Sequence, residues 1–422
     1  MTGVSAAGLA ALAGCSGGNG GGSGTEEPME TEDPTDTPIS TPTDTATPTP
    51  EPTAAPDVPI LNYALTLEHL ENAFYRDALE TFADDEIAGA SVLSGVAAGI
   101  RRGVPDELRR AGDHEAAHVD ALSATVENLG GTPVEEASYE WGYETPSEFL
   151  ETAAAVENTG VAAYAGAAPR IANNDVLAAA AGIHSVEARH AALLNVLVGD
   201  SPYPAGVDEA KSVDAVLEIA SNFVTSEVDA SAFRRADDAA PDLARAAEND
   251  VSDVEVLNYA LTLEHLENAF YRDGLDDMSD TRIVNADALA PFSESSRNAV
   301  PDRLRTIGAH EQAHVDALTA TVEDLGGDPV EEAEYDFGYT DASEFLGVAR
   351  ALENTGVSAY AGAAPTVAND DVFAAAIGIH SVEARHASFL NRLNGEPEYP
   401  AAVDEPRTMS EVREIAGQFI VG

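Results

Sequence analysis

The chain carries one sequence twice. Residues 61–75 and 257–271 both read LNYALTLEHLENAFY. The offset of 196 residues then persists without insertion or deletion, so that His114 in the first copy corresponds to His310 in the second. A repeat this long indicates two copies of one domain and not a solenoid of short units. We expect one domain at residues 57–224, an acidic connector at 225–252 and a second domain at 253–422.

Within each copy, apolar residues recur every three or four positions, which is the period of an amphipathic helix. Pro105 suits the first turn of a helix, and Thr145 precedes Glu148 at the spacing of an N-terminal capping box. Strand signals are nearly absent. The sequence predicts an all-α protein of two tandem four-helix bundles, each with a short fifth helix. In the first copy the expected helices are 58–80, 104–129, 145–167, 175–198 and 212–224.

The first 56 residues differ from the rest. Residues 1–14 are small and apolar and end directly before Cys15, the only cysteine. Residues 1–15 resemble a lipoprotein signal segment with its lipobox, although no positively charged segment precedes the apolar run. The alternative is a run of small residues followed by an unmodified cysteine. Residues 16–56 are rich in Gly, Thr, Pro and acidic residues, which predicts a disordered linker.

We therefore expect lipidation of Cys15 and an extracellular protein that is anchored to the cell membrane as a lipoprotein. No apolar run of 18 or more residues occurs, so the lipid is the only membrane attachment that we expect.

The charge balance is extreme, with 75 acidic and 21 basic residues and a formal net charge of -54. Lys211 is the only lysine. Nucleic acid is excluded as a partner, because phosphate binding requires clusters of Lys and Arg. So acidic a surface is typical of halophilic proteins, where concentrated salt screens the repulsion. The alternative is a surface that binds cations.

Each copy places four Glu and two His where they can share one bundle interior. Glu68 and Glu157 stand singly on apolar helix faces, and two further helices each carry Glu-x-x-His. Positions i and i+3 lie on one side of a helix, so each Glu-His pair can converge on one point. Buried carboxylates require compensation, which here points to cations. The candidate metal ligands are Glu68, Glu115, His118, Glu157, Glu187 and His190, and in the second copy Glu264, Glu311, His314, Glu353, Glu383 and His386.

One Glu on each of two helices and Glu-x-x-His on each of two others is the ligand pattern of di-iron and di-manganese carboxylate bundles. With the stretches LNYALTLEHLENAFY, ENTGVAAYAGAAP and GIHSVEARHAALLN, it makes each copy similar to the ferritin-like superfamily. The resemblance is strongest to the branch that includes plant desiccation-related proteins, and it covers both repeats but not residues 1–56.

The resemblance implies two Fe ions per bundle, or two Mn ions, or one of each. It implies that Glu115 and Glu187 bridge the two metals. Glu68 and His118 would complete one metal site, and Glu157 and His190 the other. Further side chains are expected beside these ligands, with core packing or partial exposure as the alternative. They are His114, His184, Tyr75 and Tyr164, and in the second copy His310, His380, Tyr271 and Tyr360.

Residues 114–118, HEAAH, also have the spacing of a zinc-protease helix, in which both His bind the metal and the Glu is the general base. A protease would leave Glu68, Glu157 and the pair Glu187 and His190 unexplained. We therefore favour the carboxylate bundle, in which His114 is not a ligand.

Two functions remain open at this point. A ferroxidase-like di-metal oxidase would oxidise Fe(II) or consume dioxygen or peroxide, in metal or oxidative-stress handling. A non-catalytic protein would instead serve a structural or binding role in stress or desiccation. The expected partners are metal ions and dioxygen or peroxide. We also expect the two bundles to pack on each other as an intramolecular pseudo-dimer.

Overall fold

The structure is a computed structural model that describes residues 55–226, 233–234 and 251–421. The signal segment, the lipidation of Cys15, nearly all of the linker and most of the connector lie outside the described residues. The described residues form helices and no strand, apart from isolated bridges between Tyr139 and Val224 and between Tyr335 and Ile420. The all-α prediction is confirmed.

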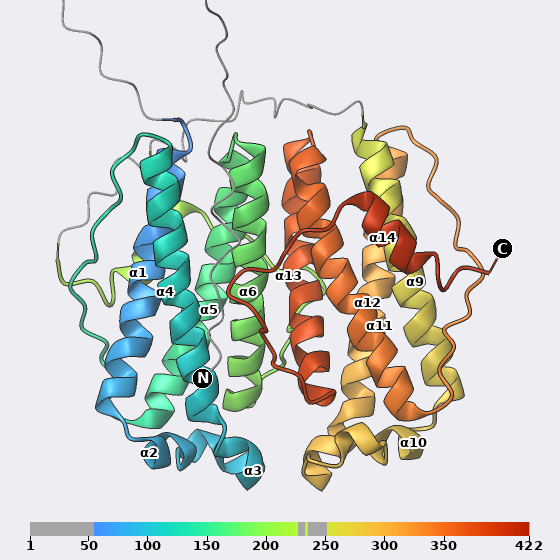
Figure 1. Ribbon diagram of the computed structural model, residues 1–422, viewed down its shortest axis with the longest axis horizontal. Helices are drawn as coiled ribbons and strands as arrows, with labels where there is room; N and C mark the ends of the chain where they lie inside the picture. The colour runs from blue at the N-terminus through green and yellow to red at the C-terminus, as the bar shows by residue number, and fades with distance from the viewer. Residues whose placement is uncertain (1–54, 227–232, 235–250, 422) are drawn as a thin grey trace, which may run out of the picture. The chain divides into compact units, whose positions relative to one another are not determined.

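Four long helices build each half of the protein (Figure 1). In the first half α1 packs along α4 and α5 packs along α6, and the second half repeats this pairing with α9, α11, α12 and α13. The long helices are α1 (Val58–Thr81), α4 (Val104–Asn128), α5 (Pro146–Ala167), α6 (Asn174–Val198), α9 (Asp253–Asp277), α11 (Glu294–Asp324), α12 (Ala342–Ala363) and α13 (Asp370–Leu393).

Short helices join or cover the long ones. The fifth helix of each copy is α7 (Val213–Ala220) in the first half and α14 (Met409–Ala416) in the second. The others, which the periodicity does not predict, are α2 (Asp84–Ala88), η1 (Ser91–Gly95), α3 (Ala98–Arg101), η2 (Ala168–Arg170), α10 (Asp280–Val284), η3 (Asp287–Leu289) and η4 (Ala364–Thr366). Pieces of three to five residues are too short to show a helical period.

Local sequence signals account for several helix ends. The Thr145 side chain accepts a hydrogen bond from the Glu148 N–H, and the Glu148 carboxylate accepts one from the Thr145 N–H, which completes the expected capping box. The two copies differ before their second long helix. The chain breaks at Gly103 before α4, whereas α11 continues through the corresponding position, which is Ala299. Glycine favours such a break because it weakens a helix interior.

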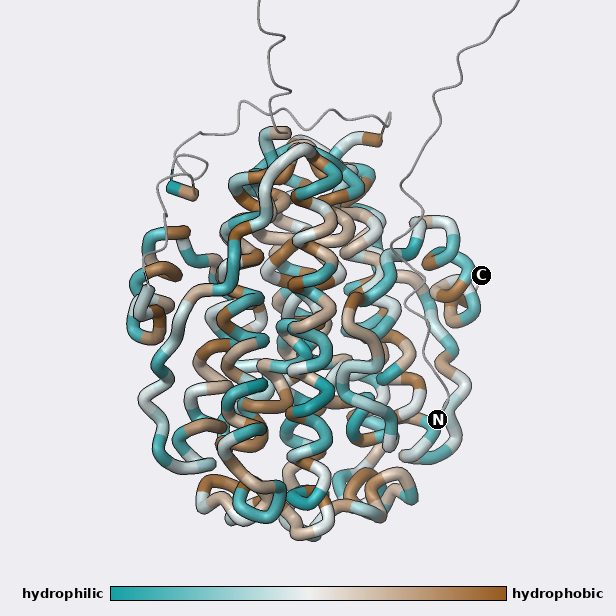
Figure 2. The backbone as a smooth tube through the Cα atoms, turned by 60° about the vertical axis from the view of Figure 1, so that its left-hand side comes forward, coloured by the Kyte–Doolittle hydropathy of each residue, from teal (hydrophilic) through white to brown (hydrophobic). Residues whose placement is uncertain are grey.

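The two halves meet along α6 and α13, which lie side by side (Figure 1). Small apolar residues of both halves form one buried cluster there, and small side chains allow a close approach of the helices. The cluster comprises Val161, Ala188, Ala191, Val357, Ala384 and Ala387. Hydrophobic and hydrophilic residues are interspersed along each helix, as expected for amphipathic helices (Figure 2). Among the described helices, none is long and apolar enough to cross a membrane.

Candidate metal centre

All six candidate ligands of the first bundle meet in its interior. They come from α1, α4, α5 and α6, and each is at most 1% exposed. Their ligand atoms form two groups, within each of which the atoms lie within 4.8 Å of one another. One group contains Glu68, Glu115, His118 and Glu187, and the other contains Glu115, Glu157, Glu187 and His190. The two groups share Glu115 and Glu187, which are the carboxylates that the resemblance designates as bridging.

The second bundle repeats this arrangement. One group contains Glu264, Glu311, His314 and Glu383, and the other contains Glu311, Glu353, Glu383 and His386. The helical spacing of Glu-x-x-His explains the convergence, since three residues return a side chain to the same face.

Both histidines of the first centre turn Nδ1 toward the carboxylates. His118 Nδ1 lies 3.0 Å from Glu68 Oε2, and 3.1 Å from both Glu115 Oε2 and Glu187 Oε1. His190 Nδ1 lies 2.9 Å from Glu115 Oε1 and 3.4 Å from Glu157 Oε2. Nδ1 is therefore the histidine atom that would face a metal at either position.

Burial and mutual charge shift the protonation of this cluster. Burial raises the pKa of Glu68 to about 7, although His118 opposes the shift. Burial and the nearby Glu115 charge raise the pKa of Glu187 well above its usual range. Burial alone would lower the pKa of His190, but Glu157 and Glu115 raise it to about 10. In the absence of metal, protons therefore compensate the buried carboxylates.

Hydrogen bonds do not satisfy the cluster. Among the described residues, Glu115 Oε1, Glu157 Oε2, His190 Nδ1 and both carboxylate oxygens of Glu187 make no well-formed hydrogen bond, and the only nitrogens beside these oxygens are the two histidine Nδ1 atoms that they share. Buried polar atoms normally make well-formed hydrogen bonds, so a cluster of buried carboxylates that must share two histidine nitrogens indicates a cation site. Carboxylate oxygens with imidazole nitrogens suit iron and manganese.

Tyrosines hold the two carboxylates that are not shared. Tyr75 donates a hydrogen bond to Glu157 Oε1, and Tyr164 donates one to Glu68 Oε1. Tyr271 donates to Glu353 at 2.5 Å, and Tyr360 donates to Glu264. In the first bundle the tyrosine of α1 therefore bonds the glutamate of α5, and the tyrosine of α5 bonds the glutamate of α1. These bonds fix one oxygen of each outer carboxylate.

His114 contacts a candidate ligand but belongs to neither ligand group. Its Nδ1 lies 3.2 Å from His190 Nε2, on the side of the ring that faces away from the carboxylates, and His310 repeats the contact with His386 at 3.1 Å. The HEAAH motif therefore contributes Glu115 and His118 to the centre. This arrangement favours the carboxylate interpretation over that of a zinc protease.

Each centre also receives contacts from the other half of the chain. His118 Nε2 lies 2.6 Å from the carbonyl oxygen of Ala402, and His314 Nε2 lies 2.6 Å from that of Gly206. A carbonyl can only accept, so each ring carries its proton on Nε2 and leaves Nδ1 for the metal.

Two tyrosines also contact the candidate centre of the opposite half. The Tyr399 ring lies edge-on to His190 with a centroid distance of 4.5 Å, and its hydroxyl donates to the Glu107 carbonyl at 2.9 Å. Tyr203 lies 4.9 Å from the His386 ring in the same way. Sequence reasoning missed these residues. Their signal is the Tyr-Pro pair that recurs at 203–204 and 399–400 in both loops.

Buried polar contacts also link the halves. Arg189 is 2% exposed and donates from Nε to Asp404 at 2.7 Å, and Arg385 pairs with Asp208 at the same distance. The ring of His184, which is expected beside the ligands, lies 6.5 Å from the Tyr164 ring, and its Nδ1 lies 3.4 Å from Nδ1 of His380 in the other half. These two histidines therefore belong to the contact between the halves.

One buried carboxylate per bundle is missing from the predicted set. Glu71 is 2% exposed, and its counterpart Glu267 is 3% exposed. Burial and the nearby Glu187 charge raise the pKa of Glu71 well above its usual range. The signal for Glu71 is its i+3 spacing from Glu68 on α1, which places both on one helix face.

The ferritin-like domain family matches this chain twice, at residues 56–200 and 252–396. The matches cover more than half of the chain and both candidate metal centres. The chain therefore belongs to the ferritin-like domain family. A comparison with curated proteins gives no match.

Proposed function

We propose that each bundle is a dinuclear metal centre, and that the chain binds two metal ions in each half. The observation that carries this proposal is the pair of overlapping ligand groups, in which Glu115, Glu157 and Glu187 each have at least one buried oxygen without a well-formed hydrogen bond among the described residues. The donor set favours iron or manganese, or one of each. Glu115 and Glu187 would bridge the metals, because both groups contain them.

The surrounding residues prepare the ligands for metal. Tyr75 and Tyr164 hold the outer oxygens of Glu157 and Glu68, so that the other oxygen of each faces the centre. The Ala402 carbonyl keeps the His118 proton on Nε2. A bound iron pair would supply oxidation of Fe(II) by dioxygen or peroxide. We therefore propose a ferroxidase-like protein of metal or oxidative-stress handling.

The test is the metal content of the full chain. We would load it anaerobically with Fe(II) or Mn(II), remove loosely bound metal and compare it with Glu115→Ala/Glu311→Ala. We expect about four metals per chain, two in each bundle, and their loss in the variant. Wild-type protein without stoichiometric metal would refute the dinuclear centre. Dioxygen consumption by the iron-loaded protein then tests the oxidase chemistry, and a stable Fe(II) form in air would contradict it.

We further propose that the two halves work as an intramolecular pseudo-dimer. Its support is the reciprocity of the contacts: Ala402 and Tyr399 contact the first centre, and Gly206 and Tyr203 contact the second. Each centre would then depend on both halves.

We also propose that Cys15 is lipidated and anchors the protein at the outer face of the cell membrane. Its support is the apolar segment before Cys15 and the Thr- and Pro-rich linker after it. Partition into detergent that Cys15→Ser abolishes would support the anchor. Equal partition of both proteins would contradict it.

A further inference from the structure

A half-open pocket of about 860 Å³ lies between the two halves, at the end of the molecule where α3 lies (Figure 1). This volume includes the open space at the mouth, and it is within the range of ligand pockets, about 300–1,000 Å³. The first half lines the pocket with the segment around η1 and α3 and with the end of α6. The second half lines it with the first turns of α11 and the end of α13. The space is therefore enclosed by both halves together.

Equivalent positions of the two copies line this pocket. The 196-residue offset relates Leu197 to Leu393 and Val196 to Arg392, and all four residues are in its walls. The pocket therefore lies where corresponding parts of the two halves meet. The last pair also shows that the walls are not chemically equal, because an apolar side chain in the first half corresponds to a guanidinium in the second.

The basic residues of the pocket, Arg303 and Arg392, both belong to the second half. Their counterparts in the first copy are Glu107 and Val196. Basic residues are few in this chain, 21 against 75 acidic ones, so two of them at one pocket require a reason. The first half contributes only apolar residues and glycines, which are Val92, Gly95, Val96, Ile100, Val196, Leu197 and Gly199. One side of the pocket is therefore cationic and the other is apolar.

The Arg303 guanidinium has a hydrogen-bond donor to spare. Its Nη1 is buried and has no hydrogen-bond partner within the described part of the chain, and its Cζ lies 5.6 Å from the centroid of the Phe389 ring. Arg392 differs, because its Nη1 pairs with Glu398 at 3.0 Å. A buried donor without an acceptor is unfavourable, and a guanidinium forms its strongest hydrogen bonds with anionic oxygens. The free Nη1 therefore indicates one anionic group as its partner.

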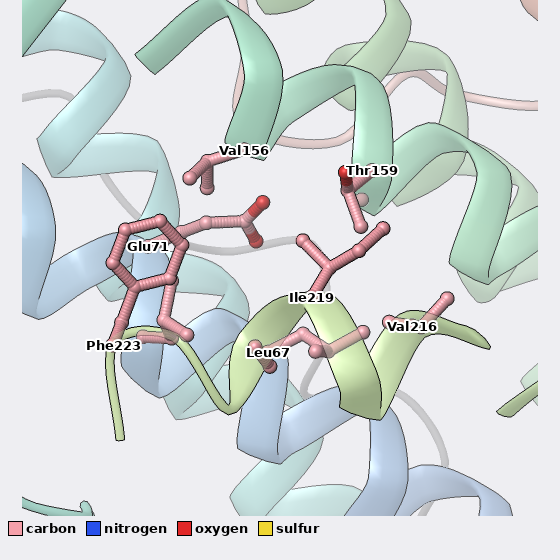
Figure 3. A pocket seen from close by; sticks show the side chains of 10 residues that line it. Leu67, Glu71, Val156, Thr159, Val216, Ile219 and Phe223 are labelled. Carbon is pink, nitrogen blue, oxygen red and sulfur yellow. The ribbon is translucent and has the colours of Figure 1, made fainter. Parts of the chain in front are cut away.

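The pocket beside α7 offers no such donor. It is lined mainly by apolar residues of α1, α5 and α7, and the Glu71 carboxylate points into the space between Val156 and Ile219 (Figure 3). No basic residue is among the described residues that line it, so it would not attract an anion. This difference favours the pocket between the halves as the anion site.

We propose that the pocket between the halves binds a carboxylate that carries an alkyl chain. The carboxylate accepts a hydrogen bond from Arg303 Nη1, and the alkyl chain packs on apolar residues of the first half such as Ile100 and Leu197. The unequal charge of the two sides sets the direction in which the ligand lies. Because the ligand contacts both halves, its binding stabilises their association. The inference does not depend on metal at the candidate centres.

The experiment is a calorimetric titration of the full chain with octanoate in molar KCl, which screens exposed charges more than buried ones. Two further probes separate the parts of the ligand. 1-Octanol has the same chain without the charge, and acetate has the charge without the chain. We expect a single octanoate per chain, and we expect each of the other probes to bind at least about tenfold more weakly.

Three variants locate the ligand. Arg303→Gln should weaken octanoate binding about 10- to 100-fold and change 1-octanol binding little. The matched control is Arg305→Gln, which removes an exposed arginine of the same helix that pairs with Asp280, and it should bind octanoate as wild type does. Ile100→Ser introduces the residue that the second copy has at this position, Ser296, and should weaken octanoate and 1-octanol alike, about threefold to tenfold.

An absence of octanoate binding, or equal affinities for octanoate and 1-octanol, would overturn the proposal. Equal octanoate affinity of wild type and Arg303→Gln would do the same. Octanoate binding that Glu115→Ala/Glu311→Ala abolishes would place the carboxylate at the candidate metal centres and would also overturn it. If Arg303→Gln does not fold, Ile100→Ser and the comparison of octanoate with 1-octanol still decide. The metal content is a separate measurement, so failure here leaves the dinuclear centres standing.

Discussion

Tyr399 belongs to the second half of the chain but contacts the candidate metal centre of the first. Its ring is 1% exposed and lies 4.5 Å from the His190 ring and 5.5 Å from the His114 ring. We predict that Tyr399→Ala weakens metal binding in the first bundle and leaves the second bundle unchanged. The reason is that His190 would lose the side chain that holds its ring and keeps water away.

The magnitude follows from the contacts that are lost. Truncation of a large buried aromatic side chain costs roughly 3–5 kcal/mol of folding stability. Changes in residues that support a metal-binding histidine typically weaken metal affinity about 10- to 100-fold. Tyr399→Phe keeps the ring and removes only the hydrogen bond to the Glu107 carbonyl, so it should cost about 1 kcal/mol of stability and little metal affinity.

The assay requires proteins with one working centre. Glu311→Ala/His314→Ala removes the second centre and leaves the first, and Glu115→Ala/His118→Ala does the reverse. In each background the rate of Mn(II) loss to an excess of chelator is measured with and without Tyr399→Ala. The matched variant is Tyr203→Ala, which contacts the second centre and should show the opposite pattern. Faster loss from the second centre in Tyr399→Ala, or equal loss from both, would refute the reasoning.

Three further predictions concern stability. Asp404→Ala removes the carboxylate that pairs with the buried Arg189, and it should lower the free energy of unfolding by about 3–5 kcal/mol in denaturant titrations. A loss below about 1 kcal/mol would show that the ion pair contributes no more than an exposed one. Burial lowers the pKa of His380 from 6.5 to about 4. Between these pH values the unfolded chain binds a proton that the folded chain does not, so stability falls as pH falls, by up to about 3 kcal/mol. His380→Gln should lose that part of the pH dependence, and an unchanged slope would contradict the assignment. Thr145→Ala removes a helix cap and should cost about 1 kcal/mol, whereas Thr125→Ala, away from any helix start, is the control.

The helices and the six candidate ligands of each bundle were predictable because both depend on spacing within one helix. Glu115 and His118 share a face whatever surrounds them, and Glu68 stands out as an acid within an apolar stripe. Glu71 follows the same rule, because its i+3 spacing from Glu68 places it on the same buried face of α1.

Contacts between the halves could not be predicted in this way. Helical periodicity shows which face of α6 is buried, but not that His184 meets His380 or that Arg189 meets Asp404. The same limit applies to Ala402, which contacts His118 through its backbone carbonyl. Every residue has such a carbonyl, so the residue type at this position does not indicate the contact. Such contacts depend on how a loop without regular structure crosses to the other half.

The loop after α6, which carries Tyr203, and the loop after α13, which carries Tyr399, each contact the candidate centre of the other half. This exchange determines how the centres would respond to dilution. A metal centre that a separate subunit covers opens whenever the subunits part, so its occupancy falls with protein concentration. Here Tyr203 and Tyr399 lie on the same chain as the centres that they cover, and the effective concentration of each loop is set by the polypeptide itself. One molecule alone therefore supplies the tyrosines that contact both candidate centres.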